Sequence, residues 1–116
     1  MWYTYCSTGF PELDRDHAKI DDLLCRAVGA ATPAEEHKFL IATYRAVIAH
    51  IRVRNLLLGL EKSMQEKEQD RNFTRFVREK IRERSQGLIS VQHLASDVRH
   101  MLIVHAMTHY REKQAV

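Results

Sequence analysis

Glycine and proline interrupt this chain so rarely that its long uninterrupted segments favour helix. The 116 residues contain four glycines and two prolines, and the segments between them are rich in residues of high helix propensity. Apolar residues recur at intervals of three and four within these segments, which is the spacing of one helix face. We therefore expect an all-α fold.

Four helices are predicted, over residues 14–28, 33–58, 63–86 and 91–113. Thr32 and Ser90 are the expected N-caps of the second and fourth, and Thr32-Pro33-Ala34-Glu35 has the pattern of a capping box with proline at the first helical position. Glycine at 29, 59 and 87 is expected to end the first three helices.

The short connections between these helices favour an up-down-up-down antiparallel four-helix bundle. Residues 1–13 are expected to form an extended N-terminal arm, since Pro11 breaks any earlier helix and Trp2 is too apolar for a free tail. The whole chain, residues 1–116, is then one domain.

Composition narrows the class of protein. No apolar run is long enough to span a membrane, and no secretory signal pattern is visible at the start. Two cysteines, Cys6 and Cys25, are expected to be free thiols of a reducing compartment, with Cys25 packed at the edge of an apolar stripe. We expect a cytoplasmic protein with no membrane partner, and a net charge of +3 does not point to nucleic acid.

Helices two and four are apolar nearly all round, although a bundle core covers only one face of each. Ile103 and Val104 lie in one such apolar run. Exposed apolar surface of this kind marks partner interfaces. We expect a homo-oligomer or a protein partner, with the alternative that the N-terminal arm covers part of this surface.

Three of the seven histidines occupy positions suited to a site in the bundle core. His17, His50 and His105 fall on the first, second and fourth helices, the last two within apolar sequence. A metal site in a bundle core needs imidazoles and carboxylates that project inward from several helices. The histidines at positions 37, 93 and 100 are expected at the surface.

The sequence resembles the bacterial hemerythrins. Trp2, Thr8-Gly9-Phe10 and the run from Leu13 to Ile20 are similar to the family's opening segment, whose histidine corresponds to His17. His50-Ile51 and Leu102-Ile103-Val104-His105 are similar to its ligand segments on helices two and four. The resemblance implies a four-helix bundle that descends from a protein binding oxygen at a di-iron centre with five histidines and two bridging carboxylates.

This chain departs from the family's pattern at the other four ligand positions. The resemblance places Arg54 and Tyr110 where the family has its bridging carboxylates, and Gln69 and Phe73 where it has the histidine pair of helix three. A fixed cation at Arg54 opposes a second metal ion. An intact oxygen-binding di-iron centre is therefore not expected.

Two interpretations of the remaining histidines stay open. In the first they are core residues, Arg54 pairs with Asp14, Asp16 or Tyr110, no cofactor is bound, and the protein is a non-enzymatic regulatory or scaffold bundle that acts through association. In the second, the three histidines hold one iron or zinc ion, supported by His109 or Tyr110, in a metal-binding or gas-sensing protein. We favour the first interpretation, and neither one predicts an enzyme.

The third helix is strongly basic. Its arginines at 71, 75, 78, 82 and 84 are only partly offset by Glu79 and Glu83. The pattern is typical either of a binding face for an acidic partner, a nucleotide or nucleic acid, or of an exposed helix with intrahelical ion pairs. We favour the second interpretation, because no aromatic residues are interleaved on that face.

Overall fold

Four helices account for the chain in a computed structural model, which describes residues 11–58 and 64–115. They are α1 (Pro11–Val28), α2 (Pro33–Leu58), α3 (Met64–Ser85) and α4 (Val91–Ala115). Within these ranges no strand occurs. The prediction of an all-α four-helix protein is confirmed.

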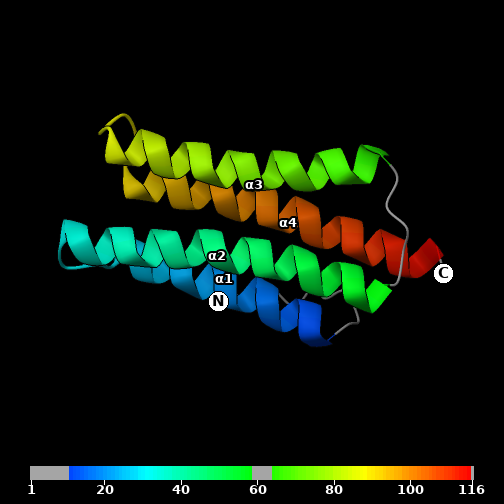
Figure 1. Cartoon of the computed structure of the whole chain (residues 1–116). Helices are drawn as coiled ribbons and strands as arrows, with labels where there is room; N and C mark the ends of the chain where they lie inside the picture. Colours follow the sequence, from blue (N-terminus) through cyan, green and yellow to red (C-terminus); the bar gives the residue numbers. More distant parts are fainter. Residues whose placement is uncertain (1–10, 59–63, 116) are drawn as a thin grey trace.

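The helices pack as a ring in which each contacts two neighbours. α1 packs against α2 and α4, and α3 packs against the same two helices. Figure 1 shows each helix running in the opposite direction to the one before it. The N-terminal ends of α1 and α3 therefore lie beside the C-terminal ends of α2 and α4.

The expected start signals form the expected hydrogen bonds. The backbone N–H of Glu35 donates to Thr32 Oγ1 at 3.1 Å, and that of His93 donates to Ser90 Oγ at 3.0 Å. Each side chain satisfies one of the N–H groups that the first helical turn leaves without a backbone acceptor.

Glycine ends α3 in the expected way. Gly87 has a φ of 74°, a conformation that L-residues with a Cβ rarely adopt. Its N–H donates to the carbonyl of Arg84 at 3.0 Å, and the N–H of Leu88 donates to that of Glu83 at 2.9 Å. These two bonds are those of a Schellman motif. Gly59, the expected stop of α2, lies outside the described residues.

The start of α1 was predicted three residues too late. The helix begins at Pro11 and not near Asp14. Proline disrupts a helix interior, but at the first helical position it lacks only an N–H that would have no partner there. The expected arm is thus shortened to residues 1–10, which lie outside the described residues.

An inward stripe of each helix builds the core. On α1 the stripe runs Leu13, His17, Ile20, Leu24, Ala27. Near the N-terminal ends of α1 and α3 the stripes include the polar residues His17 and Asp70. Toward the other end of the bundle the stripes of the remaining helices are mostly apolar, with Leu40 and Val47 on α2, Val77 and Ile81 on α3, and Leu94 and Val98 on α4. Burial of such side chains stabilises the bundle by about 1.5 to 3 kcal/mol each.

Ion pairs join three of the neighbouring helix pairs. Arg99 Nε of α4 lies 2.6 Å from Asp21 Oδ1 of α1. Arg84 of α3 binds both carboxylate oxygens of Glu36 on α2 at 2.9 and 3.1 Å. Lys80 Nζ of α3 lies 3.0 Å from Asp97 Oδ2 of α4. These pairs connect α4 with α1, α3 with α2 and α3 with α4 around the core.

Candidate metal centre

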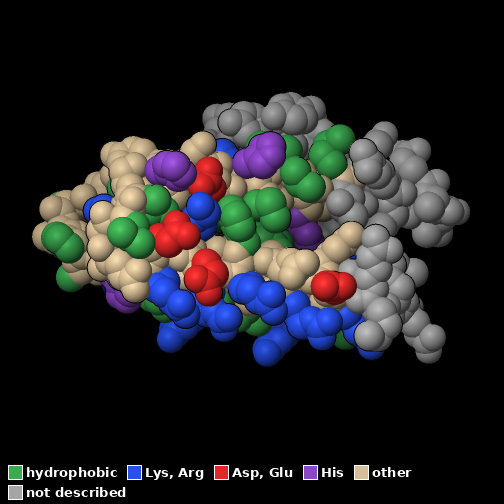
Figure 2. All heavy atoms as spheres, turned by 90° about the horizontal axis from the view of Figure 1, so that it is seen from above, with side chains coloured by type: hydrophobic (Ala, Val, Ile, Leu, Met, Phe, Trp, Pro, Cys, Tyr) green, Lys and Arg blue, Asp and Glu red, His purple; other side chains and the backbone are tan. Residues whose placement is uncertain are grey.

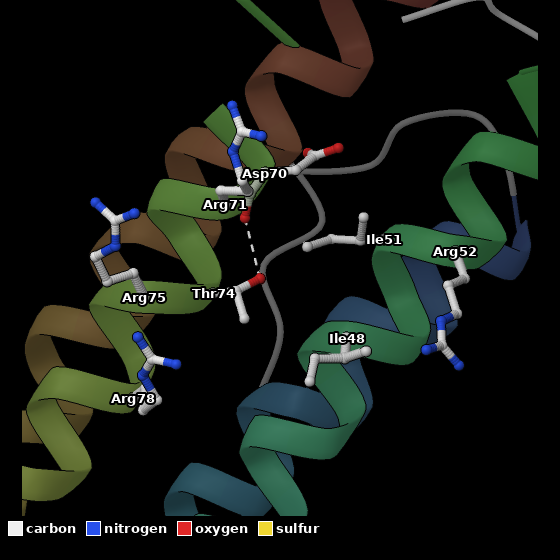
Figure 3. A pocket seen from close by; sticks show the side chains of 8 residues that line it. All are labelled: Ile48, Ile51, Arg52, Asp70, Arg71, Thr74, Arg75 and Arg78. Atoms are coloured by element: carbon white, nitrogen blue, oxygen red, sulfur yellow. Dashed lines mark hydrogen bonds between the residues drawn. The ribbon is translucent and has the colours of Figure 1, made fainter. Parts of the chain in front are cut away.

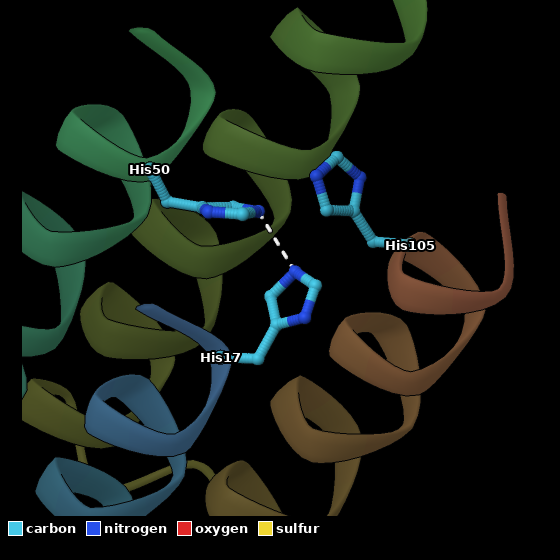
Figure 4. Close-up of side chains that lie close together, drawn as sticks. All are labelled: His17, His50 and His105. Atoms are coloured by element: carbon cyan, nitrogen blue, oxygen red, sulfur yellow. Dashed lines mark hydrogen bonds between the residues drawn. The ribbon is translucent and has the colours of Figure 1, made fainter. Parts of the chain in front are cut away.

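Three helices bring three histidines to one point. His17 of α1, His50 of α2 and His105 of α4 point toward one another from three sides (Figure 4). One nitrogen of each ring lies within 4.8 Å of the corresponding nitrogens of the other two. The closest pair is His17 Nε2 and His50 Nε2, 2.9 Å apart.

The position of these histidines follows from helical spacing. His17 lies four residues after Leu13 and three before Ile20, so it belongs to the buried stripe of α1. His50 follows Val47 by three residues on the buried stripe of α2. Their side chains are fully buried, and that of His105 is partly buried.

Burial keeps the two innermost imidazoles neutral. Desolvation, and then the nearby His50, lower the pKa of His17 from 6.5 to about 3. Desolvation, and then the positive charge of Arg54, lower the pKa of His50 to about 4. At neutral pH both rings therefore offer lone pairs, which is the protonation state that metal ligation requires.

A carboxylate orients His50. Asp16 Oδ2 lies 3.2 Å from His50 Nδ1, and since the ring is neutral this nitrogen carries the proton and donates it. His50 Nε2 is then an acceptor, and His17 Nε2–H donates to it. The contact with Asp16 therefore directs His50 Nε2 toward the centre of the cluster. Carboxylates orient metal-ligating histidines in the same way, by accepting the proton of the nitrogen that does not bind the metal.

An ion pair lies next to the histidines. Arg54 is 4% exposed, and its Nη1 lies 3.7 Å from Asp70 Oδ2 of α3. This separation is a charge contact and not a hydrogen bond. A further contact of Arg54 Nη1 is the side-chain oxygen of Asn55, at 3.5 Å.

Sequence reasoning did not identify Asp70 as a partner of Arg54. The signal for it is in the sequence, because Asp70 precedes Phe73 by three residues and Val77 by seven. All three lie on the buried stripe of α3. An acidic residue on such a stripe predicts a buried cation nearby.

The two residues expected to replace the family's histidine pair on helix three differ in burial. Phe73 is buried, and its ring centroid lies 5.0 Å from that of His105. It fills space beside the histidines. Gln69 is exposed. The side chains of His109 and Tyr110, proposed as supporting ligands, lie outside the described residues.

A cavity opens beside the cluster. It has a volume of about 280 Å³ and lies between α2, α3 and α4. Its lining includes Arg54, Asp70, Phe73, Val104 and His105. A small molecule in this cavity would contact His105 on one side and the guanidinium group of Arg54 on another.

The remaining predicted residues lie at or near the surface. Histidines 37, 93 and 100 are exposed, as expected. Ile103 is partly buried and Val104 is 49% exposed. Cys25 is a free thiol as expected, but it is exposed and not packed. It lies where α1 faces α4, and Arg99 Nη2 is 3.3 Å from its sulfur.

Comparison of the chain with protein-family models, with curated proteins and with solved structures finds no match. The resemblance to the hemerythrins therefore stays a prediction. None of the helices in the described ranges has the length and apolar character needed to cross a bilayer.

Proposed function

We propose that this bundle binds one divalent transition-metal ion through His17, His50 and His105. The observation that carries the proposal is the convergence of three imidazole nitrogens, within 4.8 Å of one another, from three different helices. Three neutral imidazoles form a ligand set that suits zinc and, among redox metals, copper or iron.

The contacts around the cluster support this ligand set. Histidine nitrogens bind zinc at about 2.0 Å, so two of them in a tetrahedral site lie about 3.3 Å apart. The 2.9 Å between the nitrogens of His17 and His50 is close to that separation. Ligation requires the Nε2 proton of His17 to move to Nδ1, while His50 already presents a lone pair because Asp16 accepts its Nδ1 proton.

The number of ions is limited to one by charge. Arg54 and Asp70 occupy the space beside the histidines, and the guanidinium group supplies the positive charge that a second ion would bring. No second ligand set is formed by the described residues. The residues present therefore fit one ion and do not fit a pair.

When bound, the ion would supply a Lewis-acid position with room for one further ligand. This chain's own residues would bind and orient the ion, and Phe73 and Val104 would restrict water at the cavity beside it. No side chain of the described site is placed as a catalytic base toward a substrate. We therefore propose a binding or sensing role and not an enzyme.

Metal titration tests the proposal. Protein stripped with a chelator and titrated with Co²⁺ is expected to bind one equivalent and to develop the visible absorption of a tetrahedral site. His50→Ala is expected to abolish both. His37→Ala, an exposed histidine on the same helix, is the matched control. Equal binding by the His50 variant, or two iron ions per chain, would overturn the proposal.

We also propose that the chain associates with itself or with a protein partner through α4. Val104 is 49% exposed and Met107, one turn further on, is 37% exposed. Both follow the partly buried Ile103 along α4. The proposal is compatible with metal binding, because the apolar residues face outward while His105 faces the cluster.

A further inference from the structure

A second cavity lies between α2 and α3 and is separate from the histidines. Its volume is about 480 Å³. Ile48 and Ile51 of α2 form an apolar floor, and the arginines at 52, 71, 75 and 78 stand around it (Figure 3). Cavities of this size accommodate small organic molecules.

The position of the α3 arginines follows from their spacing. Arg71, Arg75 and Arg78 are four and three residues apart, so they share one face of the helix and extend over about 10 Å of it. Arg52 belongs to α2, and in Figure 3 its side chain is directed away from α3. Figure 2 shows Lys and Arg side chains gathered in a row along one edge of the α3 side of the molecule.

The arginines of α3 divide into two groups. Those near its end are neutralised: Arg82 pairs with Glu79 at 3.6 Å, and Arg84 binds Glu36 at 2.9 Å. The four arginines of the cavity are exposed, and within the described part of the chain none of them pairs with a carboxylate. The expected pairing of arginines with carboxylates therefore occurs only in the second half of α3, within the helix for Arg82 and with α2 for Arg84.

Two polar residues of the cavity restrict where an anion would lie. Asp70 lines one end, beside Arg71, and its negative charge already interacts with Arg54. Thr74 donates its hydroxyl proton to the carbonyl of Asp70 at 3.0 Å, so it has no proton left for an anion. The favourable position is the opposite end, beside Arg75 and Arg78 of α3.

We propose that this cavity binds a small organic polyanion, a compound of nucleotide size in which phosphate or carboxylate groups are attached to an apolar or flat body. Guanidinium groups bind such oxygens in pairs of parallel hydrogen bonds. Four like charges around one cavity repel one another, and a multivalent anion removes that repulsion. The isoleucine floor favours an organic body over an inorganic ion, which would leave it exposed to water.

Calorimetric titration of the chelator-treated protein with three probes tests the proposal. The probes are ATP without divalent cations, inorganic triphosphate and adenosine. They distinguish the contribution of the phosphate charge to binding from that of the organic body. ATP is expected to bind one per chain, more tightly than triphosphate, and adenosine is expected to bind hardly at all. Because the metal has been removed, the result is independent of the histidine site.

Variants assign the binding to the cavity. Arg75→Gln with Arg78→Gln is expected to weaken ATP binding by about tenfold or more, because two charge-assisted contacts at exposed positions are lost together. Arg15→Gln with Lys38→Gln removes the same charge from exposed positions elsewhere and is the matched control. Ile48→Gln is expected to weaken the binding of ATP and leave that of triphosphate unchanged, which also shows that this variant folds.

Three results would overturn the proposal. The first is equal ATP affinity in the double arginine variant and its control. The second is triphosphate binding as tight as that of ATP, because the apolar floor would then have no role. The third is an oligothymidylate that binds far more tightly than ATP and loses its affinity in the arginine variant, because the face would then serve nucleic acid.

Discussion

The buried histidines make the stability of the metal-free protein depend on pH. In the unfolded chain both imidazoles titrate near 6.5, whereas in the folded protein they titrate at about 3 for His17 and about 4 for His50. Between these values the unfolded state binds more protons. The free energy of unfolding is therefore expected to fall as pH decreases from about 6.5 to about 4, by up to about 1.4 kcal/mol per pH unit for each histidine.

Urea denaturation in the presence of a chelator, at several pH values, measures this effect. His50→Gln is expected to reduce the pH dependence, because only His17 then resists protonation. His37→Gln is expected to leave it unchanged, since that side chain is exposed. A free energy of unfolding that stays constant between pH 6.5 and 4.5 would contradict the neutral, buried state of both rings.

The ion pair between Arg54 and Asp70 gives a second prediction for single residues. Asp70→Asn leaves a guanidinium group that is 4% exposed next to a neutral amide. The expected destabilisation is about 1 to 2 kcal/mol, because a largely buried guanidinium group that loses a nearby negative charge keeps its desolvation cost.

A double-mutant cycle separates this effect from a loss of packing. Arg54→Met with Asp70→Asn is expected to be more stable than Asp70→Asn alone, since no charge is then buried. Chemical denaturation of the wild type and the three variants supplies the comparison. If Asp70→Asn proved as stable as the wild type, Asp70 would not be the counter-charge of Arg54.

At the level of the helices, Gly87 gives a prediction about the backbone conformation after α3. A Cβ built on Gly87 has no atom within 4 Å, while the φ there is 74°. Gly87→Ala therefore creates no clash, and its expected cost of about 1 kcal/mol comes from the left-handed conformation. Gly29→Ala is the control, because its φ is not positive. Thermal denaturation should show a lower midpoint for the Gly87 variant only.

The sequence predicted the caps of the helices, because a cap depends only on residues that are close together in the chain. Thr32, Ser90 and Gly87 act within a few residues of their own position, and each forms the expected contact. The expectation that Pro11 precedes the first helix was wrong, because proline disrupts a helix interior but is favoured at the first helical position. The difference between the two roles lies in the residues that follow it.

Contacts between helices were harder to predict than caps. The resemblance assigned His17, His50 and His105 to one site, and the structure brings them together. Asp70 and Arg54 pair across α2 and α3, and their contact depends on how each helix is rotated. Helical spacing shows which residues share a face. It does not show which face of the next helix they meet.

At the scale of the whole molecule, four of the six buried polar residues of the described chain lie toward one end of the bundle. His17, His50, Arg54 and Asp70 are at the end where α1 and α3 begin, whereas Leu24, Leu40 and Ile81 are nearer the opposite end. Side chains that can bind a ligand are thus concentrated at the end where α1 and α3 begin.

The exposed apolar residues of α4 lie at this same polar end, which makes association the property of the whole molecule to test. Val104 lines the cavity beside His105 and is 49% exposed. A partner seated on Val104 and Met107 would cover the mouth of that cavity and remove apolar surface from water. Metal binding and association would then be coupled, because both involve the same face of α4.

Sedimentation velocity over a range of concentrations tests self-association through this face. The wild type is expected to form a species larger than the 13.6 kDa chain. Val104→Glu is expected to shift the equilibrium to monomer, because a charge at the contact must be desolvated. Val28→Glu, at an apolar position of α1 that is 37% exposed, is the control. A wild type that is monomeric at all concentrations would refute self-association, whereas equal dissociation by both variants would show that the contact is not on α4.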